Sequence, residues 1–481
     1  MTSFLTSPTP SPAGDLTAHP WFFCGIGGSG MLPLALILRG HGAEIAGSDR
    51  SRDQGRSAEK FAWLEAQGIQ IFPQDGSGLT SADQTLVASA AVENTVPEVV
   101  RAGEFGCARM TRAELLAKLF NASGCGIAVG GTSGKSTVTG MLGWIMAQAG
   151  RDPTIMNGAV MKNFVADDAP FASARIGGGG VFVSEVDESD GSIALYRPAI
   201  AVLNNVSLDH KSLEELRALF GGFLAASRRV ALNLDDAETA ALLPFALEAL
   251  TFAIERSDAT LHVAPGTIED AASAISATVI DTRDGSRHAL TLGVPGRHNL
   301  ANALAALGGA SLADIPVAQA VTALGSFAGL ARRFEIVGTS ADDITVIDDF
   351  GHNPEKVAAT LDTLRRHPGR IIAFFQPHGF GPLRQMGVQL AEILATRLGP
   401  DDITVLCDPV YFGGTVNRSV SSEHVVAMIA AAGGHAEHIA DRAACGDRIV
   451  ALARPGDRIV VMGARDDTLS AFAKDILARV P

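Results

Sequence analysis

Short apolar runs alternate with stretches of helical periodicity along the chain. Apolar runs that predict buried strands lie at 21–24, 43–46, 85–88, 126–129, 181–184 and 199–203. Stretches that predict helices lie at 31–41, 58–67, 96–103, 112–119, 138–150 and 213–224. Strands that alternate with helices in this way are typical of parallel sheets covered by helices. The pattern therefore predicts an α/β protein.

The final third of the chain shows the same alternation. Strands are expected at 344–350, 370–376, 403–407 and 458–463. Helices are expected to begin near Pro354, Arg384, Ser421, Ala443 and Asp466. These elements predict a second Rossmann-like, doubly wound unit. By contrast, the stretch at 277–292 predicts a β-hairpin that turns at Asp284-Gly285.

Length and local composition indicate how the chain is divided. At 481 residues it is long enough for about three domains. The Ser/Thr/Pro-rich start predicts a disordered lead-in at 1–19, and the polar segment at 121–124 predicts a linker. We therefore expect a Rossmann-like domain at 20–118, a central nucleotide-binding domain at 119–327 and a Rossmann-like C-terminal domain at 328–481.

Charge and cysteine content exclude several classes of protein. The formal net charge is −14, and the chain has no basic block, no aromatic-interleaved Lys/Arg stripe and no zinc-ligand spacing. Nucleic acid is therefore not an expected partner. Five scattered cysteines indicate reduced thiols, and the N-terminus predicts neither a signal peptide nor a membrane span. We expect a cytoplasmic protein that is a monomer or a weak homodimer.

A glycine-rich loop joins the strand expected at 126–129 to the helix expected at 138–150. Its sequence is Gly130-Gly131-Thr132-Ser133-Gly134-Lys135-Ser136-Thr137. In such a loop, backbone N–H groups and the helix N-terminus bind phosphate oxygens. Lys135 is expected to reach the terminal phosphates, and the Ser136 hydroxyl to hold Mg²⁺. Val129 departs from the full pattern, so the alternative is a Gly/Ser-rich turn, but we predict a user of ATP.

A second glycine loop lies near the N-terminus. It reads Gly25-Ile26-Gly27-Gly28-Ser29-Gly30 and stands between the strand at 21–24 and a helix that begins at Met31. The spacing matches the dinucleotide fingerprint, with Asp49 after the next apolar run. This predicts a diphosphate at the helix end and Asp49 near a ribose or base. NAD, FAD and nucleotide diphosphates all satisfy the pattern, and a structural tight turn is the alternative.

Acidic and histidine residues follow two expected strands of the central domain. The cluster Glu185-Val186-Asp187-Glu188-Ser189-Asp190 follows 181–184, and Asp209-His210 follows 199–203. Parallel sheets bind ligands at the carboxyl ends of their strands, which favours metal ligands here. The alternatives are a solvated acidic turn for the cluster and a hydrogen-bonded loop histidine for His210, because Mg²⁺ prefers oxygen ligands.

Further polar residues stand where elements begin or end. His298, Asn299 and Asn302 fall on the first turn of a small-residue helix, where they can reach a ligand or cap the helix. Arg332-Arg333 precedes the C-terminal unit; such an arginine can meet a transferring phosphoryl group or form a surface pair at a hinge. Other polar residues gather at the ends of the C-terminal strands: Asp348, Asp349, His352, Gln376, His378 and Arg465.

Taken in order, these motifs resemble the Mur ligase family of ATP-dependent amide-forming enzymes over nearly the whole chain. The N-terminal motifs are Gly25 to Met31, Ser48-Asp49, Ser89-Ala90, Pro97-Glu98-Val99 and Arg112-Ala113-Glu114. The central motifs are the loop at 131–136, the cluster at 185–190, Asn205, Asp209-His210 and Gly296-Arg297-His298-Asn299 with Asn302-Ala303. The C-terminal motifs are Arg332-Arg333-Phe334-Glu335, Asp348-Asp349-Phe350-Gly351-His352 with Pro354, and Phe375-Gln376-Pro377-His378.

The resemblance implies a UDP-sugar domain, a central P-loop ATPase domain and a C-terminal domain that closes over an amino acid or peptide acceptor. Implied contacts to the UDP substrate are Gly25, Gly27, Gly28, Ser29, Gly30, Met31, Ser48, Asp49 and Ser89. Implied contacts to ATP are Gly131, Thr132, Ser133, Gly134, Lys135, Ser136, Thr137, His298, Asn299 and Asn302, with Arg333 at the γ-phosphate and Asp349 at the ribose. Implied ligands of Mg²⁺ are Ser136, Glu185 and His210, and implied catalytic residues are Lys135, Glu185, His210 and Arg333. Implied acceptor contacts are His352, His378 and Arg384.

The implied reaction moves the γ-phosphoryl group of ATP onto a carboxylate, after which an amine displaces phosphate. UDP-N-acetylmuramate is the implied carboxylate and L-alanine the implied amine. Two alternative functions leave some of these residues unexplained. A nicotinamide oxidoreductase built on the N-terminal glycine loop would have no use for Lys135. A catalytically silent nucleotide-binding protein would not need Lys135, Glu185 and His210.

Two departures from the family pattern concern the acceptor. The alanine-adding branch reads His-Arg-Tyr-x-Arg, whereas this chain reads His378-Gly379-Phe380-Gly381-Pro382-Leu383-Arg384, and Arg465 stands where a glycine is usual. The segments at 157–164, 196–198 and 203–205 instead resemble the recycling branch, which attaches a whole tripeptide. The acceptor therefore stays open between L-alanine, a tripeptide and another amine.

Overall fold

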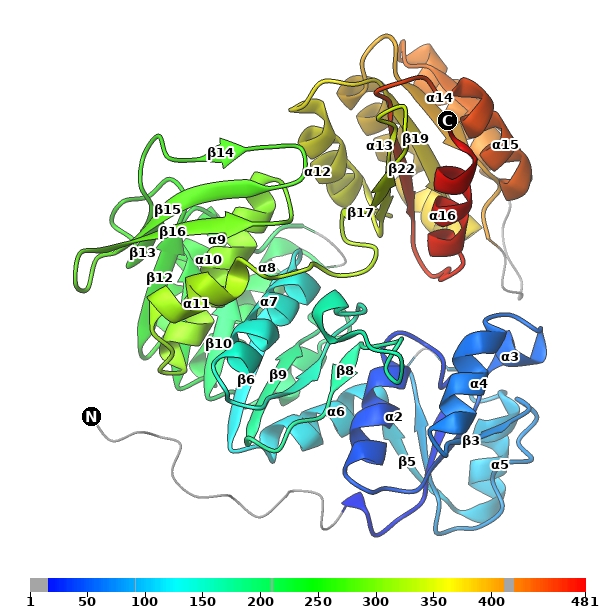
Figure 1. Ribbon diagram of the computed structural model, residues 1–481. Helices are drawn as coiled ribbons and strands as arrows, with labels where there is room; N and C mark the ends of the chain where they lie inside the picture. Colours follow the sequence, from blue (N-terminus) through cyan, green and yellow to red (C-terminus); the bar gives the residue numbers. More distant parts are fainter. Residues whose placement is uncertain (1–15, 91, 209–210, 411–418) are drawn as a thin grey trace. The chain divides into compact units, whose positions relative to one another are not determined.

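The computed structural model describes residues 16–90, 92–208, 211–410 and 419–481. These residues hold three β-sheets covered by helices (Figure 1). They form two compact units, of which one contains the first sheet and all of the second except Asp270 of its edge strand. The other contains the third sheet, from Leu330 to Pro481, together with the segments Asp270–Ala274 and Val294–His298. Most of the expected lead-in at 1–19 lies outside the described residues.

The first sheet has five parallel strands in the order β3-β2-β1-β4-β5. The strands are β1 (Trp21–Cys24), β2 (Ile45–Ser48), β3 (Gln70–Phe72), β4 (Thr85–Ala88) and β5 (Ala108–Thr111). The helices are α2 (Met31–Gly40), α3 (Arg50–Asp53), α4 (Ala58–Ala66), α5 (Pro97–Phe105) and α6 (Arg112–Asn121). The strand order reverses at β1, which places the loop at 25–30 at a switch point of the sheet, where ligands bind in such folds.

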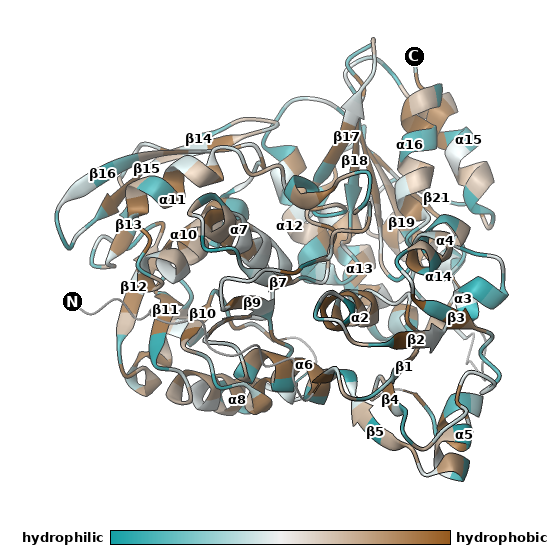
Figure 2. Cartoon of the chain, turned by 60° about the horizontal axis from the view of Figure 1, so that its bottom comes forward, coloured by the Kyte–Doolittle hydropathy of each residue, from teal (hydrophilic) through white to brown (hydrophobic). Residues whose placement is uncertain are grey.

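Local sequence explains several of these helices. Helix α2 is apolar on most sides and its side chains are mostly buried, whereas α3 is short and polar (Figure 2). Helix α5 begins with Pro97, whose missing N–H costs nothing at a first helical position. Helix α6 begins with a capping box, in which Thr111 and Glu114 exchange side chain–backbone hydrogen bonds.

The second sheet has eleven strands. In spatial order they run β14-β15-β13-β12-β11-β10-β6-β9-β7-β8, and β16 pairs with β15. Strands β6, β7 and β9–β13 form the parallel part, while β8 and the β15–β16 hairpin are antiparallel. The strands that precede α8 (Leu213–Ala225) are β6 (Cys125–Gly130), β7 (Thr154–Met156), β8 (Ala174–Arg175), β9 (Val181–Glu185) and β10 (Ile200–Leu203). The later strands are β11 (Arg229–Asn233), β12 (Ala249–Ala253), β13 (Leu261–Val263), β14 (Glu269–Asp270), β15 (Ile275–Asp281) and β16 (Ser286–Leu292). The helices are α7 (Lys135–Gln148), α8 (Leu213–Ala225), α9 (Ala237–Ala241), α10 (Arg297–Leu312) and α11 (Val317–Leu324).

The third sheet has six strands in the order β17-β18-β22-β19-β20-β21, parallel except for the edge strand β17. The strands are β17 (Glu335–Thr339), β18 (Thr345–Asp349), β19 (Ile371–Gln376), β20 (Ile403–Leu406), β21 (Ala436–His438) and β22 (Arg458–Gly463). The helices are α12 (Pro354–Arg365), α13 (Phe380–Arg397), α14 (Ser422–Ala431), α15 (Arg442–Leu452) and α16 (Leu469–Arg479).

Strand β19 shows why this sheet is covered on both faces. Ile371, Ala373 and Phe375 pack into one hydrophobic cluster, which includes residues of α12, α13 and α14. Ile372 and Phe374 pack into another, which includes residues of α15 and α16. Successive side chains of a strand point to opposite faces, so a strand that is apolar at every position must be buried on both.

The elements expected from the sequence agree with the structure in kind, with shifts at some ends. The hairpin expected at 277–292 is β15 and β16. The helix expected to begin near Arg384 begins about one turn earlier, at Phe380, and the helix expected near Asp466 begins at Leu469. Strand β17 was among the strands that were not expected: four of its residues are half-buried, Thr339 is exposed, and apolar and polar positions do not alternate along it. In the described residues, no helix is both long enough and apolar enough to cross a membrane.

Candidate functional site

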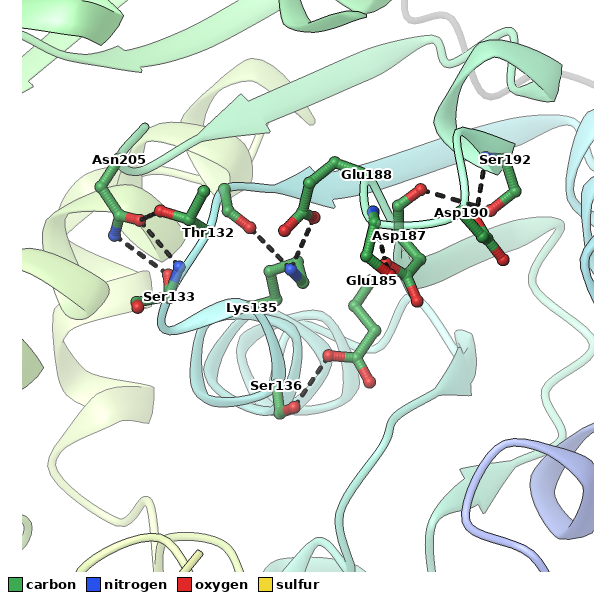
Figure 3. A network of polar contacts seen from close by, with 12 residues as sticks. Thr132, Ser133, Lys135, Ser136, Glu185, Asp187, Glu188, Asp190, Ser192 and Asn205 are labelled. Atoms are coloured by element: carbon green, nitrogen blue, oxygen red, sulfur yellow. Dashed lines mark hydrogen bonds and ion pairs between the residues drawn. The ribbon is translucent and has the colours of Figure 1, made fainter. Parts of the chain in front are cut away.

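The loop between β6 and α7 has the backbone that its glycines allow. Gly131 and Gly134 adopt φ angles of +135° and +81°, which L-residues with a side chain rarely adopt. Asn205, just beyond β10, fixes the loop from outside: its Oδ1 accepts from the Ser133 N–H at 2.8 Å and its Nδ2 donates to the Ser133 carbonyl at 3.0 Å (Figure 3). The Thr132 hydroxyl also donates to the Asn205 Oδ1, at 3.0 Å. The loop is therefore held in shape without a ligand.

Lys135 is the first residue of α7, and its ammonium group lies across the mouth of the loop. Its Nζ donates to the Gly131 carbonyl at 2.7 Å and pairs with the Glu188 Oε2 at 2.7 Å (Figure 3). The Glu188 side chain is only 5% exposed, so the pair is largely shielded from water. Glu188 was seen in the sequence only as part of an acidic cluster.

Ser136 and Glu185 form a hard-oxygen pair beside Lys135. The Ser136 Oγ donates to the Glu185 Oε2 at 2.8 Å, from the first turn of α7 to the carboxyl end of β9. A Cβ added to Gly158 would lie 2.3 Å from the Glu185 Oε1, so this position holds the carboxylate only because it is a glycine. A hydroxyl beside a carboxylate is the donor set that Mg²⁺ takes in nucleotide sites. These residues therefore fit the expected metal.

The rest of the acidic cluster is organised by local hydrogen bonds. Burial opposes ionisation of Asp187, but hydrogen bonds from the Ser189 hydroxyl and N–H, with Lys135 and Arg112 nearby, hold its pKa below the usual range. The Arg112 Nη2 lies 4.0 Å from the Asp187 Oδ2 and 3.9 Å from the Asp190 Oδ2. Two carboxylates of the cluster therefore face a cation of the preceding domain and do not form a freely solvated turn.

A chain of amides connects β10 to α10. The Asn204 Nδ2 donates to the Asn302 Oδ1 at 2.8 Å, and the Asn302 Nδ2 donates to the Asn299 Oδ1 at 3.2 Å. All three side chains are buried, and a Cβ on Gly134 would lie 2.4 Å from the Asn302 Oδ1. Asn299 and Asn302 thus lie beside the phosphate loop. His298 is exposed on the first turn of α10.

The N-terminal glycine loop is anchored by the residues that follow β2. The N–H groups of Gly25 and Ile26 donate to the Ser48 carbonyl, and the Gly27 N–H donates to the Asp49 Oδ2 at 2.9 Å. The other Asp49 oxygen caps α3 by accepting from the Ser51 N–H at 2.8 Å. The carboxylate expected near a ribose or base therefore supports the loop itself.

Two cations flank this loop. The Lys60 Nζ lies 3.3 Å from the Gly27 carbonyl, and the Arg112 side chain packs against Gly30, whose added Cβ would lie 3.0 Å from the Arg112 Cδ. Ser29 is exposed on the loop and Met31 is buried behind it. Ser89 is exposed after β4, the strand next to β1. The expected UDP-site residues thus gather at one end of the first sheet.

The turn at 332–334 is held by two buried aspartates of β18. Arg332 and Phe334 adopt φ angles of +58° and +48°, which are strained for residues other than glycine. The Arg332 Nε donates to the Asp348 Oδ1 at 3.3 Å, and burial raises the pKa of Asp348 although Arg332 opposes the rise. The Phe334 N–H donates to the Asp349 Oδ2 at 2.7 Å.

Arg333 lies between the two strained residues and is half-buried. Its guanidinium stacks 4.4 Å from the centre of the Phe350 ring. Asp349 also accepts at Oδ1 from the Gly351 N–H at 2.8 Å and from the Thr360 hydroxyl at 3.0 Å. The carboxylate expected at the ATP ribose thus makes three hydrogen bonds within its own domain.

An apolar pocket with two histidines lies at the carboxyl ends of β18 and β19. It is lined by His352, Phe375, His378, Leu383, Met386 and Leu390, among others. The two imidazoles lie edge to face, with ring centres 5.1 Å apart. Burial, with Lys356 nearby, lowers the pKa of His352 to about 3, and burial with Arg465 and Lys356 lowers the pKa of His378 to about 4. Both histidines are therefore neutral at pH 7.

Within each compact unit, the structure brings some of the site residues expected from the sequence together. Lys135, Ser136 and Glu185 share one site. His210, the remaining expected metal ligand, lies outside the described residues, and those that are described contain no group of three or more His, Cys, Asp or Glu side chains arranged to hold a metal. Arg384 is exposed on α13 and is not among the residues that line the pocket. The sequence did not indicate that Asn205 would hold the loop through hydrogen bonds to Ser133, or that Gly158 would leave room for the Glu185 carboxylate.

Comparison with known proteins gives the family. Family models match three successive parts of the chain: the Mur ligase family catalytic domain at residues 22–123, the Mur ligase middle domain at 129–310 and the Mur ligase glutamate ligase domain at 332–465. The UDP-N-acetylmuramate–L-alanine ligase of Streptomyces avermitilis is 33% identical over 464 residues, which are 93% of this chain and 94% of that relative. The chain belongs to the Mur ligase family.

Other members agree. The UDP-N-acetylmuramate–L-alanine ligase of Cutibacterium acnes is 34% identical over 473 residues, 94% of each chain. The crystal structure of the UDP-N-acetylmuramate–alanine ligase from Thermotoga maritima matches with a TM-score of 0.79 at 24% identity, over 96% of this chain and 99% of that one. The murein peptide ligase of Psychrobacter arcticus matches with a TM-score of 0.71 at 24% identity, over 96% and 98%. The prediction of an α/β Mur ligase with three domains is confirmed, while its domain boundaries and the roles of single site residues stay predictions.

Proposed function

We propose that this Mur ligase joins the carboxylate of UDP-N-acetylmuramate to the amino group of L-alanine, with hydrolysis of ATP to ADP and phosphate, in peptidoglycan precursor synthesis. The observation that carries the proposal is the site at the ends of β6 and β9, where Lys135, Ser136 and Glu185 lie side by side. The chain around this site is similar, over more than nine-tenths of its length, to UDP-N-acetylmuramate–L-alanine ligases. Because ATP and UDP-sugars are cytoplasmic metabolites, we place the reaction in the cytoplasm.

In this proposal ATP binds at the loop between β6 and α7. The loop N–H groups and the N-terminus of α7 bind the phosphates, and the Lys135 ammonium exchanges Glu188 for phosphate oxygens. Ser136 and Glu185 would hold Mg²⁺, which neutralises phosphate charge when bound. Asn299 and Asn302 lie beside the loop, where we place the adenine.

The carboxylate attacks the γ-phosphorus and ADP leaves, which gives an acyl phosphate. The acceptor amine then attacks the acyl carbon, and phosphate leaves from the tetrahedral intermediate. Negative charge develops on the transferred group in the first step; Lys135 is the cation we assign to offset it at the loop, and the family resemblance gives the same task to Arg333 of the C-terminal domain. Removal of one such donor typically slows a reaction by about 10²–10³-fold. The neutral His352 and His378 line the pocket where we place the acceptor.

The test is phosphate release from the full chain with ATP, Mg²⁺ and UDP-N-acetylmuramate, with each amine added in turn. Release that depends on L-alanine is the expected result. Release only with the tripeptide L-alanyl-γ-D-glutamyl-meso-diaminopimelate would overturn the choice of acceptor in favour of a recycling ligase. A change in nicotinamide absorbance without ATP use would overturn the ligase reaction altogether.

A further inference from the structure

An amino acid that acts as the acceptor amine brings a carboxylate with it, and that carboxylate needs a cation. The pocket at the ends of β18 and β19 is lined by apolar side chains and two imidazoles, which are neutral at pH 7. None of these lining groups can neutralise a carboxylate. The charged groups that act on the two histidines are the cations Arg333, Lys356 and Arg465, and no carboxylate is among them.

Arg465 stands out among these three because of its position and its lack of a partner. Strands β19 and β22 are parallel neighbours in which Gln376 pairs with Gly463, so His378 and Arg465 each lie two residues beyond the paired ends. The Arg465 side chain is exposed, and its guanidinium makes no hydrogen bond or ion pair with any residue the structure describes. Among the described residues its charge acts on His378, whose pKa it helps to lower.

The backbone at Arg465 is strained, and its neighbours hold the strain in place. Arg465 adopts a φ of +59°, in the left-handed region that glycine favours. On one side the Gly463 carbonyl accepts from the Arg332 Nη2 at 2.7 Å, and on the other the Asp466 carbonyl accepts from the Arg332 Nη1 at 2.9 Å. The Asp466 carboxylate is bound in turn by Gln376 at 2.9 Å and by Arg442 at 2.7 Å. A strained backbone that is held in place by its neighbours, at a residue whose side chain has no partner among the described residues, points to a role of Arg465 in function.

We propose that Arg465 binds the α-carboxylate of the acceptor, with the acceptor's side chain directed into the apolar pocket beside His378. The inference rests on the proposed function, because it needs the acceptor to be an amino acid or peptide. An arginine can meet a carboxylate with two parallel N–H···O bonds, which fixes the orientation of the amine as well as its affinity. Asp466, the acid beside Arg465 in the sequence, is already paired with Arg442 and so does not compete.

The experiment compares an amino acid with its amide. KM and kcat are measured for L-alanine and for L-alaninamide with the full chain and with Arg465→Gly, Arg465→Asn and Arg465→Lys. Glycine and asparagine suit the left-handed backbone, so these variants are expected to keep the wild-type Tm or exceed it. Arg397→Gln is the matched control, because it removes an exposed arginine of the same domain that pairs with Asp362 on the surface.

For Arg465→Gly and Arg465→Asn we expect KM for L-alanine to rise roughly 10- to 100-fold, the range for loss of a charge-assisted hydrogen bond, with kcat and the KM for ATP little changed. The wild-type preference for L-alanine over L-alaninamide should fall toward unity, and Arg465→Lys should restore part of it. The amine of L-alaninamide is less basic than that of L-alanine, but this difference is the same for every variant. It therefore cancels when the preference for L-alanine over L-alaninamide is compared between variants. A preference that survives in Arg465→Gly, or a loss equally large in Arg397→Gln, would overturn the proposal.

The two proposals fail in different ways. If the wild-type chain uses another amino acid or a peptide in place of L-alanine, the proposed acceptor is wrong, and the comparison of acid with amide is repeated on the acceptor that works. If no amine supports turnover, the acid and the amide are titrated calorimetrically into the full chain with ADP and UDP-N-acetylmuramate bound. Binding of the acid that is equal in wild type and Arg465→Gly, or absent from both, would overturn the role of Arg465.

Discussion

Asp349 offers a sharp test, because sequence and structure give it different roles. The resemblance to the Mur ligase family implies a contact with the ATP ribose, whereas in the structure Asp349 is 8% exposed and accepts hydrogen bonds from the Phe334 N–H, the Gly351 N–H and the Thr360 hydroxyl. Asp349→Ala leaves the Phe334 and Gly351 N–H groups without their acceptor, while the Thr360 hydroxyl can still donate to the Lys356 carbonyl at 3.1 Å. At about 1 kcal/mol net for each lost hydrogen bond, we expect a loss of about 2 kcal/mol in the stability of the C-terminal domain.

Hydrogen exchange followed by mass spectrometry measures this loss where it occurs. The Phe334 and Gly351 amides should lose protection, while peptides from the first two sheets exchange as in the wild type. Thr360→Val is the matched control: it removes one of the three donors and keeps the carboxylate's other two bonds, so about 1 kcal/mol should be lost. Because Phe334 is strained, its release should also free Arg333 and lower kcat. Unchanged protection at both amides, with only KM for ATP raised, would refute the anchoring role and return Asp349 to the ribose.

Three further predictions concern the nucleotide site and the histidine pocket. Lys135→Ala should abolish phosphate release while titration calorimetry still detects UDP-N-acetylmuramate; loss of both together would contradict separate sites. Gly158→Ala should raise the Mg²⁺ concentration needed for half-maximal activity, because its Cβ would lie 2.3 Å from the Glu185 Oε1, and an unchanged Mg²⁺ dependence would count against Glu185 as a ligand. The pKa of His352 falls from 6.5 to about 3 on folding, so below pH 6.5 the unfolded chain binds the proton more readily than the folded chain. The stability of the C-terminal domain should therefore fall as the pH is lowered from 6.5 to 4, and it should be constant just above pH 6.5. Urea midpoints measured across this range test the expectation. His352→Gln should reduce that dependence and leave the part due to His378, whose pKa also falls on folding, to about 4; equal slopes in the two proteins would rule His352 out as a source.

The sequence by itself determined the elements that lead to the nucleotide sites. Buried strands such as β6 and β9 appear as unbroken apolar runs, because both faces of a parallel sheet are covered. The glycines at 131 and 134 mark the phosphate loop, because only glycine takes their backbone angles without strain. A strand, a glycine loop and a helix that are contiguous in the chain are local features, so Lys135 and Ser136 were found without the fold.

Only the tertiary structure decided what residues far apart in the chain do for one another. It paired Lys135 with Glu188. It also showed that Asp49 and Asp349 accept hydrogen bonds from backbone N–H groups of neighbouring loops, because a backbone N–H that is buried away from water needs an acceptor. It also placed Arg465 next to His378, through the register of two parallel strands that lie more than eighty residues apart in the chain. Such a register is set by the packing of whole strands and helices, and no short stretch of sequence records it.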